Sequence, residues 1–423
     1  MKRLLFFISF ILILPVSVLA NDGSLFEKKL KEFISEALIN NPQLLEAKQQ
    51  INIFKEIPDQ AGSLDDPILQ FGLMNLPVDT FAFSQEPVTQ KQVTLMQKFP
   101  FPGKLGLKTE IAQKNVVMVE RNYDELQRIL IKEVKQSYYE LCFVLAAIEI
   151  TKQNKKLLKQ FVTIAQTKYS VGKGIQQDVI KAQVELSKIL DELIRLEKLK
   201  EIEKAKLNTL MNRLPQAPLE IPHGIKQTPF QYSMTDLQFM LERNRPILKQ
   251  ITAMIERFQA SRQLAEKQYF PDFNVGVRYG QREDSTIRDN PDFVSAYVGI
   301  NIPIWFETKQ KKKVAEEGYR ISRAKETYNK LKNQFFLDIK TVWEEEKKGS
   351  QVINLIKKGI IPQARQSLES ALAGYGVDKV DFLTLLANQV TLFQWEIKYH
   401  RELTDYEKNL AGLENVVGKD LFN

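Results

Sequence analysis

The sequence predicts a mainly helical protein with a small β portion. Three observations support this fold class. Most of the chain repeats apolar residues every three or four positions, four short segments alternate apolar and polar residues, and parts of the first half recur in the second. Each alternating segment is about nine residues long, near the length that a tilted strand needs to cross a bilayer.

The first 20 residues are predicted to be a cleaved signal peptide. Lys2 and Arg3 precede an apolar block at residues 4–14, and Ala20 is a small residue of the kind that signal peptidase requires. The block is too short to span a bilayer as a helix, so an uncleaved anchor is the less favoured alternative. We expect the mature chain to begin near Asn21.

Composition argues against several classes of ligand. Cys142 is the only cysteine, so the chain has no internal disulfide. The net charge of +8 is spread as mixtures of Lys and Glu along helices, which favours solvated faces over a nucleic-acid patch. His223 and His400 are far apart in the sequence. We therefore expect no metal, no cofactor and no nucleic acid.

Four segments have the alternating pattern of a strand, two in the first half of the chain and two in the second. In the third segment, residues 273–280, four apolar side chains alternate with Asn, Gly and Arg. The other segments alternate in the same way along the chain. They are residues 68–76, 92–99 and 293–302.

The predicted helices are long. Residues 105–168 keep the helical spacing without an internal Pro, and at 1.5 Å per residue such a helix is about 95 Å long. From Thr308 onward, apolar residues recur every seven positions, which predicts supercoiling with a neighbouring helix. The heptad residues are Val314, Ile321, Tyr328, Phe335 and Val342.

The chain also repeats itself. The stretch "NNPQLLEA" recurs as "NRPILKQI", and "YSVGKGIQQDVIKAQVEL" recurs as "YGVDKVDFLTLLANQVTL". We predict a first repeat at residues 21–212 with the order helix, two strands, long helix, turn, long helix. Residues 213–232 form a Pro-containing linker, and residues 233–423 form the second repeat.

Both halves pass directly from a strand into a long helix. Pro100, Pro102 and Gly103 lie at the first junction, and Pro303 and Trp305 lie at the second. Pro has no N–H for a ladder or a helix, so it suits the boundary between the two. Aromatic residues here fit a membrane interface. An ordinary β/α junction of a soluble domain is the alternative.

Four strands cannot close a transmembrane barrel, and an open edge in lipid leaves backbone groups unpaired. If the strands cross a membrane, other copies of the chain must complete the barrel, because single-chain barrels use eight or more strands.

The repeat, the "FPFPGKL" junction, "NNPQLLEA" and the segment from "IIPQARQSLES" to "NLAGLENVVG" resemble the TolC family of outer-membrane efflux channels, with the outer-membrane factors of heavy-metal efflux systems as the nearest type. The resemblance covers essentially the whole mature chain. It implies a homotrimer in the outer membrane, in which twelve strands form a barrel in contact with lipid and twelve helices form a tube across the periplasm.

The resemblance also implies roles for the two Tyr-containing turns. They would be the periplasmic tips that contact the adaptor, a membrane fusion protein, and close the tube. The residues concerned are Tyr169, Gly172, Gly174, Tyr375 and Gly376. The second turn departs from the first, because Asp378 replaces the Gly that the first turn has at position 172.

Asp378 and Asp381 are candidate gate residues. Three copies of each at an axis would place carboxylates at a constriction and favour cations. Asp381 could instead cap the helix that starts at Phe382, and both roles are compatible.

No catalytic motif is present in the sequence, and we predict a protein that is not an enzyme. The predicted function is a passive exit duct for metal ions or drugs that an inner-membrane pump and a periplasmic adaptor deliver. One alternative is the outer-membrane component of a type I protein secretion system. A second alternative is a periplasmic coiled-coil scaffold without a pore.

Overall fold

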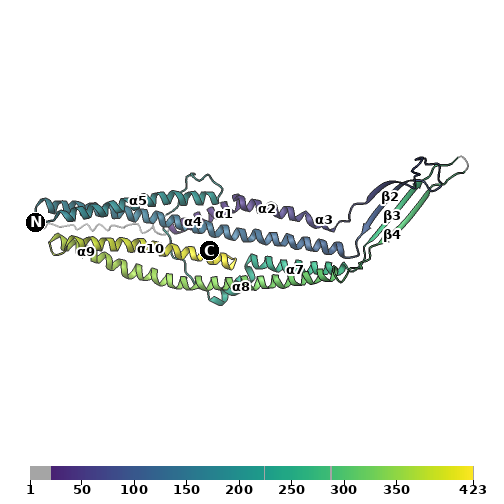
Figure 1. Cartoon of the computed structure of the whole chain (residues 1–423). Coiled ribbons are helices and arrows are strands. Elements are labelled where there is room, and N and C mark those ends of the chain that lie inside the picture. Colours follow the sequence, from purple (N-terminus) through teal and green to yellow (C-terminus); the bar gives the residue numbers. More distant parts are fainter. Residues whose placement is uncertain (1–20, 223, 286–287, 423) are drawn as a thin grey trace, which may run out of the picture. The chain divides into compact units, whose positions relative to one another are not determined.

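The structure is a computed structural model that describes residues 21–222, 224–285 and 288–422 (Figure 1). The predicted signal peptide and His223 lie outside these residues. The first half of the chain contains these elements in order: α1 (Asn21–Asn40), α2 (Pro42–Lys55), α3 (Ile57–Gly62), β1 (Ile68–Met74), β2 (Gln90–Phe99), α4 (Lys104–Ser170) and α5 (Gln176–Leu210).

The second half has a similar order. Its elements are α6 (Met234–Asn244), α7 (Pro246–Lys267), β3 (Phe273–Gln281), β4 (Phe293–Ile300), α8 (Gln310–Leu355), η1 (Ile356–Ile360), α9 (Ile361–Gly376) and α10 (Phe382–Val417). The four predicted strands and the long first helix are therefore confirmed, with shifts of up to two residues at most ends. α4 alone spans 67 residues.

The chain folds into two compact units that each draw on both halves of the sequence. One unit, here called the helical unit, combines the segment up to Leu45 with Glu125–Arg245 and Gln334–Asn423. The other, here called the sheet unit, combines Glu46–Asp124 with Pro246–Asn333. Among the described residues, no helix combines the length and apolar character that crossing a membrane would require.

The sheet unit contains one antiparallel sheet in the order β1-β2-β3-β4 (Figure 1). Because side chains alternate along a strand, the register gathers apolar residues on one face. Two rows of that face run across all four strands. They are Leu69, Leu95, Val277 and Ala296, and then Phe71, Val93, Tyr279 and Val294.

The opposite face of the sheet is more polar. One of its rows contains Gln70, Thr94, Arg278 and Ser295. The apolar face is exposed in the single chain, with Phe71 at 72% and Val294 at 74% of full exposure. β1 and β4 are the outer strands, so each has one side without a paired strand within the described part of the chain.

The helical unit has a well-packed interior. Tyr138 of α4 is fully buried, its ring contacts Phe26 and Phe33 of α1, and its hydroxyl donates to the carbonyl of Phe26 at 3.1 Å. This bond satisfies the polar end of a large buried side chain. The packing fixes α1 against the middle of α4.

α8 carries the predicted heptad pattern but leaves it half-buried. Val314, Ile321, Tyr328, Phe335 and Val342 are all of intermediate exposure. The helix then passes through a single π-helical turn, η1, and α9 follows with Pro362 in its first turn. The sequence periodicity did not predict this π-turn.

Candidate functional site: the paired helical turns

The first turn connects α4 to α5 and ends α4 in a Schellman motif. The N–H of Lys173 donates to the carbonyl of Lys168 at 2.8 Å, and the N–H of Gly172 donates to the carbonyl of Tyr169 at 3.0 Å. Gly172 has a φ of +75°, in the left-handed region that Gly adopts without steric cost. The predicted role of Gly172 in reversing the chain follows from this geometry.

The second turn, between α9 and α10, has the same bonding pattern. The N–H of Lys379 donates to the carbonyl of Gly374 at 2.9 Å, and the N–H of Asp378 donates to that of Tyr375 at 3.4 Å. Asp378 takes the place of Gly172 and has a φ of +61°. Asp tolerates the left-handed region better than most residues, so the sequence difference leaves the turn geometry unchanged.

In each turn a glycine faces a residue with a side chain, and the two residue types exchange positions between the first turn and the second. In the first turn the side chain of Lys168 occupies the helix end, and a Cβ on Gly174 would lie 3.1 Å from the Cβ of Lys168. In the second turn Val380 provides the side chain, and a Cβ on Gly374 would lie 2.5 Å from its Cγ2. Each turn therefore has room for only one of its two facing side chains.

Lys168 links the first turn to the second. Its ammonium forms an ion pair with Asp378, donates to the carbonyl of Tyr375 and lies 4.1 Å from the centre of the Tyr375 ring. This interaction lowers the pKa of Asp378, first through the hydrogen bond from Lys168 and then through its charge. Sequence reasoning missed Lys168, because a lysine near a helix end is ordinarily a solvated residue.

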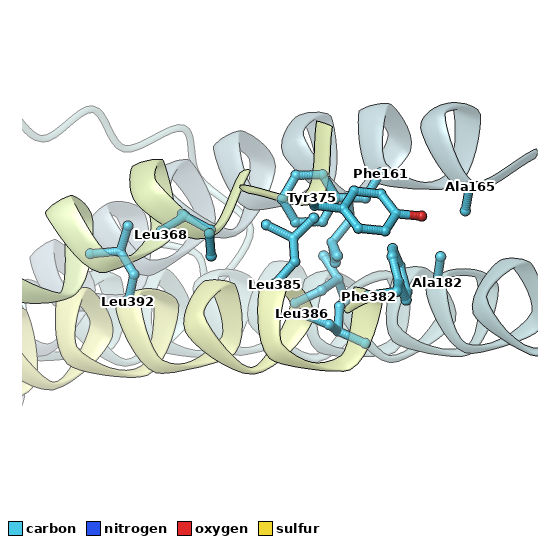
Figure 2. Close-up of a cluster of buried hydrophobic side chains, with 12 residues drawn as sticks. Phe161, Ala165, Ala182, Leu368, Tyr375, Phe382, Leu385, Leu386 and Leu392 are labelled. Atoms are coloured by element: carbon cyan, nitrogen blue, oxygen red, sulfur yellow. The ribbon is translucent and has the colours of Figure 1, made fainter. Parts of the chain in front are cut away.

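A buried apolar cluster lies beside both turns (Figure 2). Figure 2 shows the rings of Phe161, Tyr375 and Phe382 gathered between the helices, with Leu385 and Leu386 next to them. The rings of Tyr375 and Phe382 have their centres 5.6 Å apart. The cluster draws residues from α4, α5, α9 and α10, so it packs the two hairpins together.

The two predicted tyrosines therefore differ in environment. Tyr375 is buried in the cluster, whereas Tyr169 is about half exposed. Gly174 lies in the first turn, and Gly376 is the last residue of α9 with open space around its Cα. Other apolar side chains at the two turns are exposed. They are Val171, Ile175, Ile180, Val377 and Leu383.

Asp381 caps α10. Its carboxylate accepts hydrogen bonds at 2.8 Å from both the backbone N–H and the hydroxyl of Thr384. These bonds lower its pKa. Asp178, in the first turn of α5, has a raised pKa because of partial burial, and the nearby charge of Asp381 also raises it. Carboxylates from both hairpins thus lie close enough to influence one another.

The strand–helix junctions lie in the sheet unit. Pro100 follows β2, and Pro102 and Gly103 precede α4 directly. Asp272 supports this junction, because its carboxylate accepts from the N–H of Phe101 at 2.9 Å and from the ammonium of Lys104 at 2.7 Å.

At the second junction, Pro303 is partly buried and the residues around it are exposed. Trp305 is 70% exposed, and Ile302 and Ile304 are similarly exposed. An exposed indole next to exposed isoleucines is unfavourable in water, so this junction provides an apolar surface at the base of the sheet.

No group of three or more His, Cys, Asp and Glu side chains suited to a metal ion occurs in residues 21–222, 224–285 and 288–422. His400, the other histidine considered for a metal site, is partly buried, and this burial lowers its pKa.

The paired hairpins and the four-stranded sheet also occur in solved structures of outer-membrane proteins. The outer membrane protein VceC from Vibrio cholerae has the same fold, with a TM-score of 0.79 and 17% identity over 93% of this chain and 97% of that protein. The sequence profile of the outer membrane efflux protein family matches residues 33–213. Over that region the chain is similar to this family.

Two curated relatives carry informative names. The cobalt-zinc-cadmium resistance protein CzcC of Cupriavidus metallidurans is 19% identical over 317 residues, which is 75% of this chain and 74% of that protein. Toxin and drug export protein A of Aggregatibacter actinomycetemcomitans is 24% identical over 201 residues, which is 46% of this chain and 43% of that protein.

Proposed function

We propose that the chain is a homotrimeric outer-membrane channel whose three sheets close a twelve-stranded barrel. The observation that carries this proposal is the sheet itself, which exposes a continuous apolar face and has two outer strands, β1 and β4. Lipid would cover the apolar face, and neighbouring copies would supply the missing backbone partners. The more polar face would line the lumen.

The oligomeric state tests this proposal directly. Protein extracted in mild detergent should run as a trimer in light scattering coupled to size-exclusion chromatography. A monodisperse monomer that retains its β-sheet signal in circular dichroism would contradict the proposal.

A pair of Arg substitutions tests which face contacts lipid. Leu95 lies on the apolar face of β2, and Gln92 lies on the opposite face. Leu95→Arg should prevent assembly in the outer membrane, because a charge on the lipid side costs about 2–4 kcal/mol near the bilayer centre. Gln92→Arg is the matched control and should assemble normally. Equal behaviour of the two variants in membrane fractionation would argue against a lipid-facing sheet.

The helical hairpins would continue the channel as a tube through the periplasm. The half-buried heptad positions of α8 support this arrangement, because a stripe with the period of a supercoil remains available to a neighbouring helix. We propose that residues 21–212 and 233–423 are two structural repeats joined by residues 213–232, and that residues 1–20 are a signal peptide for export.

The two turns would form the periplasmic tips. Tyr169, Gly172, Gly174, Tyr375 and Gly376 would shape the surface that contacts a periplasmic adaptor, which in turn would connect the channel to an inner-membrane pump. The exposed Val171 and Val377 support such a contact, since apolar side chains at a tip favour a protein partner. Val171→Lys should reduce co-purification of the adaptor, whereas Ser170→Lys provides a nearby control.

Asp378 and Asp381 would give the tip its ion preference. Asp378 is held by Lys168 and Asp381 by the start of α10, so both carboxylates have fixed positions. Replacing both with Ala should lower the cation preference of single-channel currents in planar bilayers. Unchanged currents and selectivity would leave Asp381 with its capping role alone.

The transported substrate would be metal ions or drugs. Similarity to a metal-resistance protein supports metal ions. The partial similarity to a toxin and drug export protein supports a second candidate function, the outer-membrane component of a protein secretion system. Deletion of the gene, followed by sensitivity tests against metals, dyes and antibiotics and an assay of secreted proteins, would distinguish the two.

A further inference from the structure

A segment without regular secondary structure crosses the helical unit just before α6. This segment, residues 225–232, is called the strap here. It borders a cavity of about 670 Å³ whose other walls come from α8 and α10. Ile225 and Phe230 of the strap pack on a buried cluster that includes Tyr406 and Leu410. The strap is therefore held partly by apolar contacts.

Hydrogen bonds from Thr228 fasten the strap to α10. The N–H and hydroxyl of Thr228 donate to the two carboxylate oxygens of Glu407 at 2.7 and 2.8 Å, and its carbonyl accepts from the hydroxyl of Tyr406 at 2.9 Å. Two weaker bonds join the strap to α8. They run from Trp343 to the carbonyl of Tyr232 and from Gln227 to the hydroxyl of Ser350, both at 3.3 Å.

Within the part of the chain that the structure describes, Glu346 has no hydrogen-bond partner. It lines the cavity wall on α8 and is only 1% exposed, and neither of its carboxylate oxygens has a donor within reach. Glu407 is almost as deeply buried, at 3% exposure, but its oxygens accept from Thr228. An ionised carboxylate with no partner in such a place is strongly unfavourable.

The charged groups around Glu346 do not compensate for its burial. Glu345 and Glu407 have the same charge and oppose ionisation. Lys347 is adjacent on α8, but its ammonium lies 5.5 Å from the centre of the Trp343 ring. Tyr406 of α10 also borders the cavity, and Lys135 and Glu414 act on Glu407 with opposite signs. The strap has one charged residue, Lys226, which does not line the cavity, and its residues 227–232 carry no charge.

We propose that the strap is a proton-linked cover: it closes over Glu346 while that carboxyl is protonated, and it lifts when the carboxyl ionises. Lifting would admit water to the oxygens that the closed arrangement leaves without donors. The proposal concerns this segment alone and does not depend on the channel function.

The pKa values of Glu346 and Glu407 in the closed state determine how the stability of that state changes with pH. Burial, and then the charges of Glu407 and Glu345, raise the pKa of Glu346 to about 9. Burial also raises the pKa of Glu407 to about 7, against the bonds from Thr228. A lifted strap would return both groups to ordinary carboxylate values. Closing therefore takes up protons, and the closed state loses stability as the pH rises above those ordinary values.

Hydrogen–deuterium exchange of the full-length protein tests the proposal. The amide of Thr228 reports closure, because its N–H donates to Glu407 only when the strap is down. After correction for the intrinsic exchange rate, its protection should fall between pH 6 and pH 8. The expected fall is up to about tenfold per pH unit for each proton that closure takes up.

Glu346→Gln should remove most of this dependence above pH 7, because the neutral amide has the same shape and does not titrate. Glu344→Gln is the matched control, since Glu344 is an exposed residue of the same helix that does not line the cavity and pairs with Lys340. It should keep the wild-type slope. A wild-type slope of zero, or the same slope in Glu346→Gln, would overturn the proposal. The wild-type series alone decides the question if Glu346→Gln does not fold.

Discussion

The two helical turns reach one geometry by different sequences. Gly172 and Asp378 occupy equivalent left-handed positions, and both turns close with the same pair of backbone bonds. The first turn uses the residue without strain, whereas the second accepts strain and gains a carboxylate that Lys168 can bind. The comparison suggests that the backbone shape is the common requirement of the two turns, and that the second has acquired an additional polar contact.

The largest effect should come from adding a second side chain where a turn has room for only one. Gly374→Ala places a Cβ 2.5 Å from a methyl group of the stiff Val380 side chain. It should destabilise the second turn by about 1–3 kcal/mol, measured as loss of exchange protection. The second substitution Val380→Ala should recover most of that loss. Gly376→Ala is the control, because its Cβ would meet no atom within 4 Å.

The helix caps should give a smaller effect, comparable to that of backbone strain at Gly172. Asp381 caps α10 through Thr384, whereas Ile175 precedes α5 without a side-chain cap. Asp381→Ala should destabilise the start of α10 by about 1 kcal/mol, and Ile175→Asp should stabilise the start of α5 by a smaller amount. Exchange rates of the first-turn amides of each helix measure both. Equal and negligible effects would show that packing, not capping, fixes these helix starts.

Gly172→Ala isolates the backbone strain. The substitution forces a side chain into the left-handed region and should cost about 1–2 kcal/mol. Gly172→Asn should cost less, because Asn tolerates that region. Proteolytic cleavage rates at the first turn would rank the two variants, and a reversed ranking would show that the turn relaxes to another conformation.

The smallest effect should come from the ion pair. Lys168→Met should weaken the contact between the turns only slightly, because one partner of the ion pair, Asp378, is largely exposed. The pKa of Asp378 is lowered in the folded state, so the pair contributes above the ordinary carboxylate pKa and is lost as the pH falls below it. The difference in exchange protection between wild type and Lys168→Met should therefore shrink in strong acid, where only the contacts of Lys168 with Tyr375 remain.

Sequence patterns predicted the helices and strands in which a periodic apolar pattern extends over many residues. The strand alternation at residues 273–280 and the helical spacing at residues 105–168 each rest on several side chains, so single exceptions do not obscure them. The Pro and Gly residues at 100, 102 and 103 also marked a boundary correctly, because their backbone restrictions act locally.

Contacts between distant segments could not be predicted in this way. The link from Lys168 to Asp378 and the burial of Glu346 at the cavity that the strap borders depend on how helices pack after they form. A lysine or glutamate in a helix has the same local pattern whether it is solvated or buried. The capping role of Asp381 was predictable, because the bonds to Thr384 lie within four residues.

The π-helical turn at Ile356–Ile360 shifts the phase of the seven-residue apolar repeat. A wider turn accommodates one extra residue, so the apolar stripe that includes Val342 and the buried Ile356 resumes one position later, at the buried Ala371. Deleting Gly359 should convert the turn to regular α-helix and leave both segments in phase. The π-helical turn thus accommodates one extra residue while the apolar side chains of α8 before it and of α9 after it stay on the same side of the helix.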